Sequence, residues 1–143
     1  IVAIMTTINV LSLPKFVDFI EDIMKFRMKY NLDFAYNRIP MSINYMHWPP
    51  FLKCSILDVD MRTEMADYIQ ESSEQWLKYY SKEKYARIYL EEWDQIKRLC
   101  EQLRTEKVDY EFRDDIVVFI EEYDKRRNKK STFSSFHGCF KRL

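Results

Sequence analysis

Residues 1–48 contain three segments whose order restricts the chain to a parallel α/β arrangement. Residues 2–11 form a nearly continuous apolar run with β-branched side chains, which is typical of a buried parallel strand. Residues 12–31 repeat their apolar positions at helical spacing, and residues 41–48 alternate as a strand does. One helix between two strands predicts a crossover that leaves the strands parallel in one sheet.

The two faces of both predicted strands differ in polarity. Along residues 2–11, one side is mostly aliphatic, whereas the other side becomes polar toward its carboxyl end at Thr7 and Asn9. The aliphatic side suits packing against helices. Along residues 41–48, one side carries Met41, Ile43 and Tyr45, and the other carries Ser42, Asn44, Met46 and Trp48.

The sequence indicates where the predicted helix between the strands begins and ends. Ser12 is a candidate N-cap, and Pro14 suits a first helical turn. The pattern predicts that the helix frays near Tyr30 and Asn31. Its apolar stripe consists of Phe16, Phe19, Ile20, Ile23 and Met24.

A strand–helix–strand unit of this kind does not cover its own sheet. One helix leaves the second face and both edges of the sheet bare. If about five large apolar side chains stay uncovered, the loss at roughly 1.5–3 kcal/mol each is on the order of 10 kcal/mol, comparable to the stability of a domain. Ile1 also falls inside the predicted strand. We therefore expect upstream sequence to be missing, with cover from the rest of this chain as the alternative.

The remainder of the chain is predicted to be helical. Pro49 and Pro50 stop regular structure, residues 52–56 predict a short edge strand, and Asp58 or Asp60 could cap the next helix. We divide the chain into residues 1–57, the α/β part, and residues 58–143, a helical extension. The inward stripes of the three predicted helices are Met61, Met65, Tyr68, Ile69, Trp76 and Tyr79, then Tyr85, Tyr89, Trp93, Ile96, Cys100 and Leu103, then Phe112, Ile116, Phe119, Ile120 and Tyr123.

Composition excludes several classes of partner. Basic and acidic residues number 23 each, so no nucleic-acid partner is expected. The single glycine, Gly138, almost excludes phosphate-binding loops. The apolar run at residues 1–11 is shorter than the ~20 residues of a membrane-spanning helix and lacks a basic leader. We therefore expect no membrane partner and a cytoplasmic location.

The cysteines and histidines do not form a metal-binding pattern. Cys54, Cys100 and Cys139 lie far apart and indicate reduced thiols. With His137, Cys139 supplies only two ligands, whereas a metal site needs three or four. No metal site is therefore predicted in this chain.

No catalytic constellation is visible either, so no catalytic residue is assigned. The polar side chains on the inner strand faces are the main candidates for a binding site, because ligands of parallel α/β folds bind at the carboxyl ends of the strands. The alternative is that these side chains cap loops or bond to backbone groups. The basic run at residues 125–130 is interpreted as a solvated helix end.

The stretch TTINVLSLPKFVDFIEDI resembles a late strand and helix of the barrel of twitch-domain-containing radical S-adenosylmethionine (SAM) proteins. Asn44, Pro49 or Pro50, and the run Cys54-Ser55-Ile56-Leu57 follow in the order that this family shows. The closing EEYDKRRNKKSTFSSF resembles the usual ending of the family, although Gly138-Cys139 departs from it. The resemblance covers nearly the whole chain and depends on the order and spacing of the motifs.

This resemblance implies that residues 1–57 are the last βαβ portion of a partial (β/α) barrel. The complete enzyme would cleave SAM reductively to a 5′-deoxyadenosyl radical, which abstracts a hydrogen from a substrate that the sequence does not identify. The family's CxxxCxxC motif, which holds the 4Fe–4S cluster, is absent from this sequence, as are the twitch-domain cysteines. The implied partner is therefore a missing N-terminal part of the same polypeptide, without which the chain is inactive.

The resemblance also assigns roles to individual residues. Thr7, Asn9 and Asn44 are expected to face the cofactor. Met46, His47 and Trp48 are expected to shape the substrate pocket. Two readings from other classes stay open, namely a helical protein-interaction module built from residues 58–143 and a small α/β protein with no chemistry.

Overall fold

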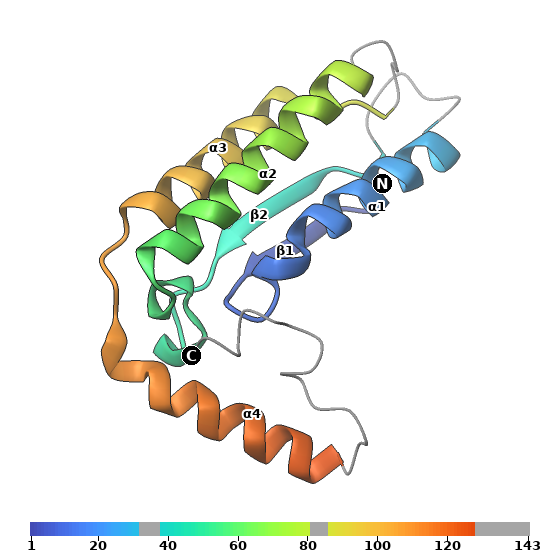
Figure 1. Cartoon of the computed structure of the whole chain (residues 1–143). Helices are drawn as coiled ribbons and strands as arrows, with labels where there is room; N and C mark the ends of the chain where they lie inside the picture. The colour runs from blue at the N-terminus through green and yellow to red at the C-terminus, as the bar shows by residue number, and fades with distance from the viewer. Residues whose placement is uncertain (32–37, 81–85, 128–143) are drawn as a thin grey trace.

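The computed structural model of the chain describes residues 1–31, 38–80 and 86–127. Within these ranges the fold is mixed α/β and mostly helical, with two parallel strands and four helices (Figure 1). The predicted α/β class and the parallel strands joined through a helix are confirmed. The assignment to a radical SAM barrel stays a prediction.

The two strands pair over five residues each. Strand β1 (Ile4–Ile8) lies parallel to strand β2 (Met41–Tyr45), with Thr7 opposite Asn44. The predicted difference between the two faces is confirmed, because Ile8 is buried whereas Thr7 and Asn44 are exposed.

Both strands are shorter than predicted. The Asn9 side-chain oxygen accepts hydrogen bonds from the backbone N–H groups of Leu11 and Ser12 at 2.9 and 3.0 Å, and this turn ends β1 before residues 10 and 11. The last ladder bond of β2 runs from the Met46 N–H to the Ile8 carbonyl at 2.9 Å. Hydrophobicity alone predicted longer strands because Val10 and Leu11 are apolar, although they belong to the turn.

Helix α1 (Phe16–Tyr30) occupies the predicted position and ends where fraying was predicted. Its predicted stripe is confirmed, since Phe16, Ile20, Ile23 and Met24 are buried and Phe19 packs against the core. The predicted cap is wrong in detail. A short 3-10 turn (Leu13–Lys15) precedes the helix, and the Ser12 hydroxyl accepts a hydrogen bond from the Asn9 N–H instead of capping α1.

The predicted edge strand at residues 52–56 is wrong. Two 3-10 turns, Pro50–Leu52 and Cys54–Ile56, occupy this region. Two consecutive prolines remove ladder donors and fix the backbone, so the chain turns instead of extending. The Leu52 carbonyl still accepts one bond from the Val10 N–H at 2.9 Å, which fastens this segment to the end of β1.

Helix α2 (Val59–Tyr79) confirms the predicted stripe in part, with Met65 and Trp76 packed against the core. Met61 and Ile69 are buried as expected, but Tyr68 and Tyr79 are exposed. The buried positions that sequence reasoning missed are Arg62, Ala66 and Ser73. Ala66 and Ser73 are small, so α2 can lie close to its neighbours.

Helix α3 (Leu90–Thr105) follows the prediction more closely. Ile96, Cys100 and Leu103 are buried, and Trp93 packs against the core. The predicted stripe member Tyr85 lies outside the described residues.

Helix α4 (Arg113–Arg127) buries one residue, Ile116, among its described positions. The predicted stripe members Phe119 and Tyr123 are exposed, and Phe119 contacts Phe51 with ring centroids 5.4 Å apart. The helix runs across the ends of the other helices, at the end of the sheet where the strands finish (Figure 1). The inward face predicted for this helix is therefore confirmed in part, since Phe112 and Ile120 pack against the core together with Ile116.

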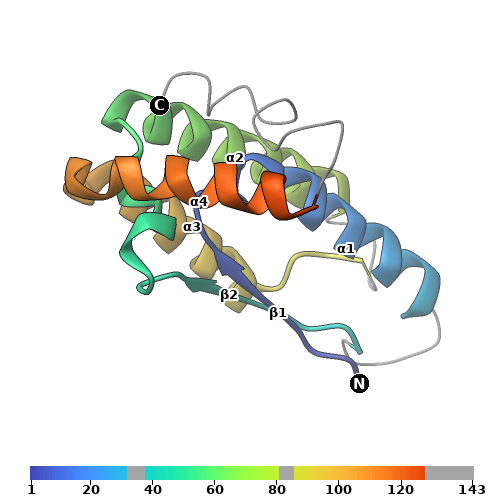
Figure 2. The same ribbon diagram turned by 90° about the horizontal axis from the view of Figure 1, so that it is seen from below.

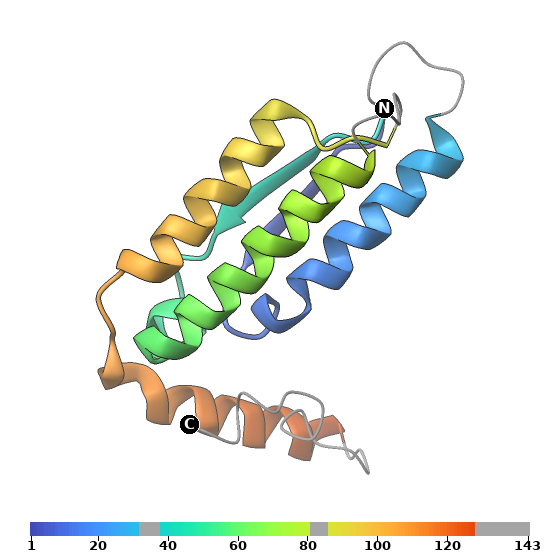
Figure 3. The same cartoon turned by 45° about the horizontal axis from the view of Figure 1, so that its top comes forward.

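Helices α1, α2 and α3 cover the same face of the sheet (Figures 2 and 3). Helix α1 lies on the β1 side of this layer and α3 on the β2 side, with α2 between them (Figure 3). One core cluster includes residues from both sides of the predicted division at residue 57, such as Ile20 and Ile96. The other face of the sheet carries Met5, Thr7, Ser42 and Asn44, which we call the open face.

A buried ion pair joins α1, α3 and the start of β2. The guanidinium of Arg27 meets the carboxylate of Glu92 in two hydrogen bonds of 2.5 and 2.9 Å, with side-chain exposures of 0% and 5%. Arg27 also donates to the Ile39 carbonyl, and Glu92 accepts from the N–H groups of Met41 and Tyr89. Because these partners satisfy both charged groups, the pair holds the elements in register.

Side chains of α3 close the outer edge of β2. Glu92 accepts the Met41 N–H at 2.9 Å, and the Gln95 side-chain oxygen accepts the Ile43 N–H at 2.6 Å. These are the N–H groups that would otherwise pair with a further strand. The sheet is thus terminated at β2.

Candidate functional site

The open face brings together two of the three predicted cofactor-binding residues. Thr7 and Asn44 are register partners at the carboxyl half of β1 and β2, and both are exposed. No hydrogen bond of either side chain to another part of the described chain is found. A hydroxyl and a carboxamide therefore face outward side by side, free to bind a ligand.

The third predicted residue, Asn9, has a different role. Its side-chain oxygen is occupied by the Leu11 and Ser12 N–H groups, and its amide nitrogen lies 3.5 Å from the Thr7 carbonyl. These contacts are those of a turn-forming asparagine. Asn9 therefore bonds to backbone groups of a loop, which was the alternative to cofactor binding.

The predicted pocket residues follow the end of β2. Met46 is half-buried, His47 is exposed, and Trp48 is 79% exposed. The His47 and Tyr45 rings lie 6.0 Å apart. Neither of the two grooves found at the sheet is lined by these three residues, so their part in a pocket stays a prediction.

A polar groove of about 220 Å³ adjoins the site at Asn44. Its other polar walls come from α3, where Gln95, Arg98 and Gln102 point to the same side. Amides and a guanidinium are suitable partners for carboxylate or phosphate oxygens. Sequence reasoning missed these three residues, although their spacing of three and four positions marks one helix face.

A second group of polar side chains is partly buried near the carboxyl end of β2. The Tyr45 hydroxyl donates to the Glu106 carboxylate at 2.5 Å, and Arg62 donates to the Leu57 and Glu106 carbonyls at 3.2 and 2.7 Å. Cys54 is fully buried in the same region. Desolvation raises the pKa of the Tyr45 hydroxyl and raises that of the Cys54 thiol to about 12. Both groups are therefore neutral at physiological pH, and Cys54 is not a nucleophile.

The buried thiols give a prediction about reactivity. Burial raises the pKa of Cys54 to about 12 and that of Cys100 to about 11, from an ordinary value of 9.0. In a Cys139→Ser variant at pH 8, iodoacetamide should modify Cys54 about a thousandfold and Cys100 about a hundredfold more slowly in the native state than in urea. Peptide mass spectrometry measures both rates. Equal rates in the two states would contradict the burial of these thiols.

The same pKa shifts set the direction of an alkaline effect. Each folded pKa lies above the unfolded one, so the folded state holds these protons more tightly. Their contribution to stability is intact below pH ~9 and is lost as the pH rises toward ~11–12.

The described ranges contain no metal site and no membrane helix. No three His, Cys, Asp or Glu side chains within residues 1–31, 38–80 and 86–127 come together as metal ligands. None of the helices in these ranges is both long and apolar enough to cross a bilayer. His137, Cys139 and the end of the basic run at residues 125–130 lie outside the described residues.

No protein-family model matches the chain, and comparison with curated proteins and with solved structures gives no match.

Proposed function

We propose that the chain is the C-terminal part of a radical SAM enzyme, with residues 1–57 forming the last strands of a partial barrel. The observation that supports this most is the pairing of Thr7 with Asn44 on the open face, toward the carboxyl ends of two parallel strands. Ligands of parallel α/β folds bind at this end. The closed outer edge of β2 adds support, since it suits the last strand of a barrel that does not close.

The polar groups present fit SAM but not the iron–sulfur cluster. Thr7 offers a hydroxyl and Asn44 offers both a donor and an acceptor, which suit the polar groups of a nucleoside or an amino acid. Cys54 and Cys100 are buried and stay protonated, so the described residues do not supply thiolate ligands. In the proposed enzyme the cluster ligands come from the N-terminal part of the polypeptide.

The work of this chain would be binding and orientation. When bound in the complete enzyme, SAM supplies a 5′-deoxyadenosyl radical for hydrogen abstraction from the substrate. Thr7 and Asn44 would hold the cofactor by hydrogen bonds, and the half-buried Met46 would exclude water at the same end of the sheet. Asn9 would position Thr7 indirectly, through the turn that ends β1.

The test begins with the reading frame upstream of Ile1, where an in-frame CxxxCxxC is expected. In the full-length protein reconstituted anaerobically, Thr7→Val and Asn44→Ala should each weaken SAM binding about tenfold, because each loses about one hydrogen bond. Calorimetric titration measures the affinity, and chromatography measures 5′-deoxyadenosine. Thr105→Val, which removes a hydroxyl bonded within α3, is the control and should change neither. Unchanged affinity in both site variants would remove Thr7 and Asn44 from the site.

The alternative of a helical interaction module is favoured by one observation. Helix α4 exposes Val117, Val118, Phe119 and Tyr123, with Val118 59% exposed. A run of exposed apolar side chains on one helix is a feature of partner-binding surfaces. If the upstream frame lacks the cluster motif, this surface becomes the leading hypothesis.

A further inference from the structure

The backbone N–H groups on the outer edge of β2 are only partly supplied with acceptors. Helix α3 runs alongside this edge (Figure 3). Its Glu92 carboxylate accepts the Met41 N–H at 2.9 Å, and its Gln95 side-chain oxygen accepts the Ile43 N–H at 2.6 Å. From the first contact to the second, the strand advances two residues and the helix three. The next N–H group on this edge is that of Tyr45, because the backbone groups of a strand alternate between its two edges.

At Tyr45 the helix presents a donor, whereas at the two earlier positions it presents acceptors. Three residues after Gln95, α3 carries Arg98. Two strand residues advance about 6.6 Å and three helix residues about 4.5 Å, so Gln102, one turn later, also lies near Tyr45. Arg98, Gln102 and Tyr45 line the same groove, and no acceptor for the Tyr45 N–H is found within the described residues. An acceptor is therefore missing between the strand and the helix at this point.

The other polar groups of the groove can also donate hydrogen bonds. The Gln95 side-chain oxygen is bonded to β2, so its amide nitrogen is left to donate. In the described part of the chain, no hydrogen bond or ion pair of the Arg98 or Gln102 side chain is found. The Glu106 carboxylate, which accepts the Tyr45 hydroxyl, is not among the described residues that line the groove. These donors therefore suit the oxygens of an anion.

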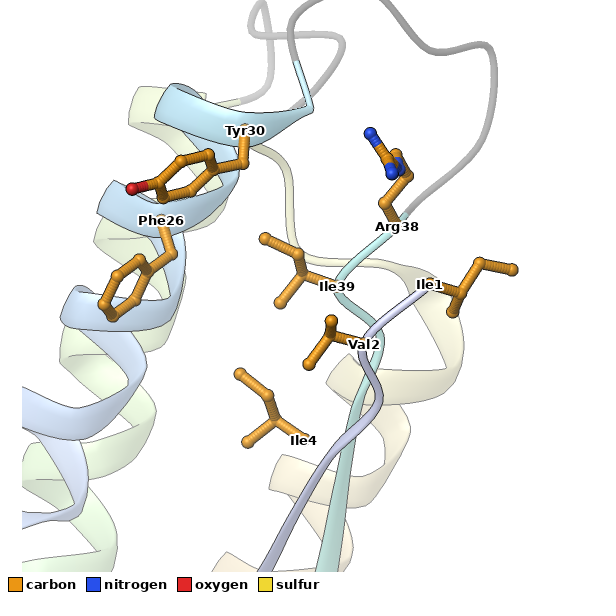
Figure 4. A pocket seen from close by; sticks show the side chains of 7 residues that line it. All are labelled: Ile1, Val2, Ile4, Phe26, Tyr30, Arg38 and Ile39. Carbon is orange, nitrogen blue, oxygen red and sulfur yellow. The ribbon is translucent and has the colours of Figure 1, made fainter.

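The mostly apolar groove between β1 and α1 differs in this respect. Figure 4 shows its Val2 and Ile4 facing Phe26 and Tyr30. In the proposed barrel that side of the sheet belongs to the preceding strand, so the apolar groove indicates no ligand of its own. The polar groove lies beside β2, the last strand, and its walls come from β2 and α3.

We propose that the polar groove binds a small organic acid, whose carboxylate accepts hydrogen bonds from the Tyr45 N–H and the Arg98 guanidinium. Of the described residues that line the groove, Arg98 alone is charged, and one guanidinium balances the single charge of a carboxylate. The neighbouring Lys97 ammonium is paired with Asp94 at 2.7 Å. The volume of about 220 Å³ limits the ligand to a small molecule, and Leu99 supplies an apolar wall for its carbon atoms.

This inference goes beyond the proposed enzyme activity, which gives no role to the side chains of α3. The groove and the proposed cofactor site share Asn44. The test therefore changes α3 residues only and uses the 143-residue chain without SAM, so that either proposal can fail while the other stands.

The experiment titrates the 143-residue chain with sodium propionate at pH ~7, where the acid is ionised, and follows it by heteronuclear NMR at constant ionic strength. The backbone amide of Tyr45 and the side-chain N–H of Arg98 should shift to saturation, with a Kd on the order of millimolar. The amides of Met41 and Ile43 already have acceptors and should stay unchanged. Propionamide, which has a similar shape and no charge, should bind at least about tenfold more weakly.

Three variants of exposed α3 positions separate the guanidinium from general charge. Arg98→Gln removes the charge and should weaken propionate binding at least about tenfold. Arg98→Lys keeps the charge but loses the planar fork, and should weaken binding about threefold. Lys97→Gln is the matched control, because it removes the same charge from the adjacent residue outside the groove, and its affinity should stay within about twofold. Circular dichroism checks that each variant keeps its helices.

Several results would overturn the proposal. Absence of a saturable shift at Tyr45, or equal affinity of propionate for the wild-type chain and for Arg98→Gln, would show that the groove does not bind a carboxylate in this way. Equal affinity for propionamide would show that charge is not recognised. Tighter binding of inorganic phosphate than of propionate at the same ionic strength would replace the organic acid by a phosphate ligand.

Discussion

Replacing Glu92 by alanine should lower the free energy of unfolding by about 3–5 kcal/mol, the largest effect that we expect from the removal of one buried charge. The change leaves Arg27 as a fully buried cation and removes the acceptor of the Met41 and Tyr89 N–H groups. Urea denaturation of the 143-residue chain measures the difference.

Two further variants identify the cause of this loss. Glu91→Ala changes the neighbouring exposed residue of the same helix turn and should cost no more than about 1 kcal/mol, the size of a charge effect at a helix start. The double replacement Arg27→Met with Glu92→Leu should recover much of the stability, because no buried charge is then left unpaired. A Glu92→Ala variant as stable as Glu91→Ala would show that the ion pair is not formed.

Replacing Ile96 by alanine should lower the free energy of unfolding by about 2–5 kcal/mol through the cavity it leaves. Ile96 is fully buried in α3 and shares a core with Ile20 of α1. Ile20→Ala should therefore cost a similar amount and shift the same single transition, seen by circular dichroism and by tryptophan fluorescence.

The matched control for both core variants is Met5→Ala on the open face. Met5 is mostly exposed, so its truncation should change stability by less than about 0.5 kcal/mol. Two separate transitions, one responding to Ile20→Ala and the other to Ile96→Ala, would show that residues 58–143 fold apart from residues 1–57.

The strand–helix–strand part of the fold could be predicted because its signal is local and periodic. Alternation placed Ile8 on the covered face and Thr7 on the open face, and helical spacing placed Ile20 against the core. The same alternation brought Thr7 and Asn44 together, since parallel strands end at the same edge. Asn9 was assigned to the cofactor because alternation places it on the same face as Thr7. Its side chain instead forms the turn that ends β1, and the alternation of polar and apolar residues does not reveal such a turn.

Contacts between distant helices could not be predicted in the same way. In α2, the small Ala66 and Ser73 face inward while Tyr68 and Tyr79 face outward, because the distance between helices decides which side chains fit. The size and hydrophobicity of the two tyrosines had predicted that they face inward. In α4, apolar spacing placed Ile116 and Ile120 against the core correctly, but the helix crosses the end of the layer, where Phe119 and Tyr123 stay exposed.

The partners of Glu92 and Gln95 were beyond sequence reasoning for another reason. Each accepts an N–H group from a strand about fifty residues earlier in the chain, and no local pattern marks such a pair. In the sequence, Glu92 is one of two adjacent acidic residues, and nothing near it indicates these partners. The same limit applies to the polar groove at Asn44, whose second wall is a distant helix.

The side-chain closure of β2 has a consequence for truncated forms of the protein. A polypeptide that stops before residue 90 keeps both strands and α1 but loses the two acceptors that occupy Met41 and Ile43. Such a product would have unpaired backbone groups on the outer edge of β2 as well as on that of β1. Further chains would then add to either edge of the sheet. Helix α3 therefore prevents self-assembly through the β2 edge, in addition to its part in packing.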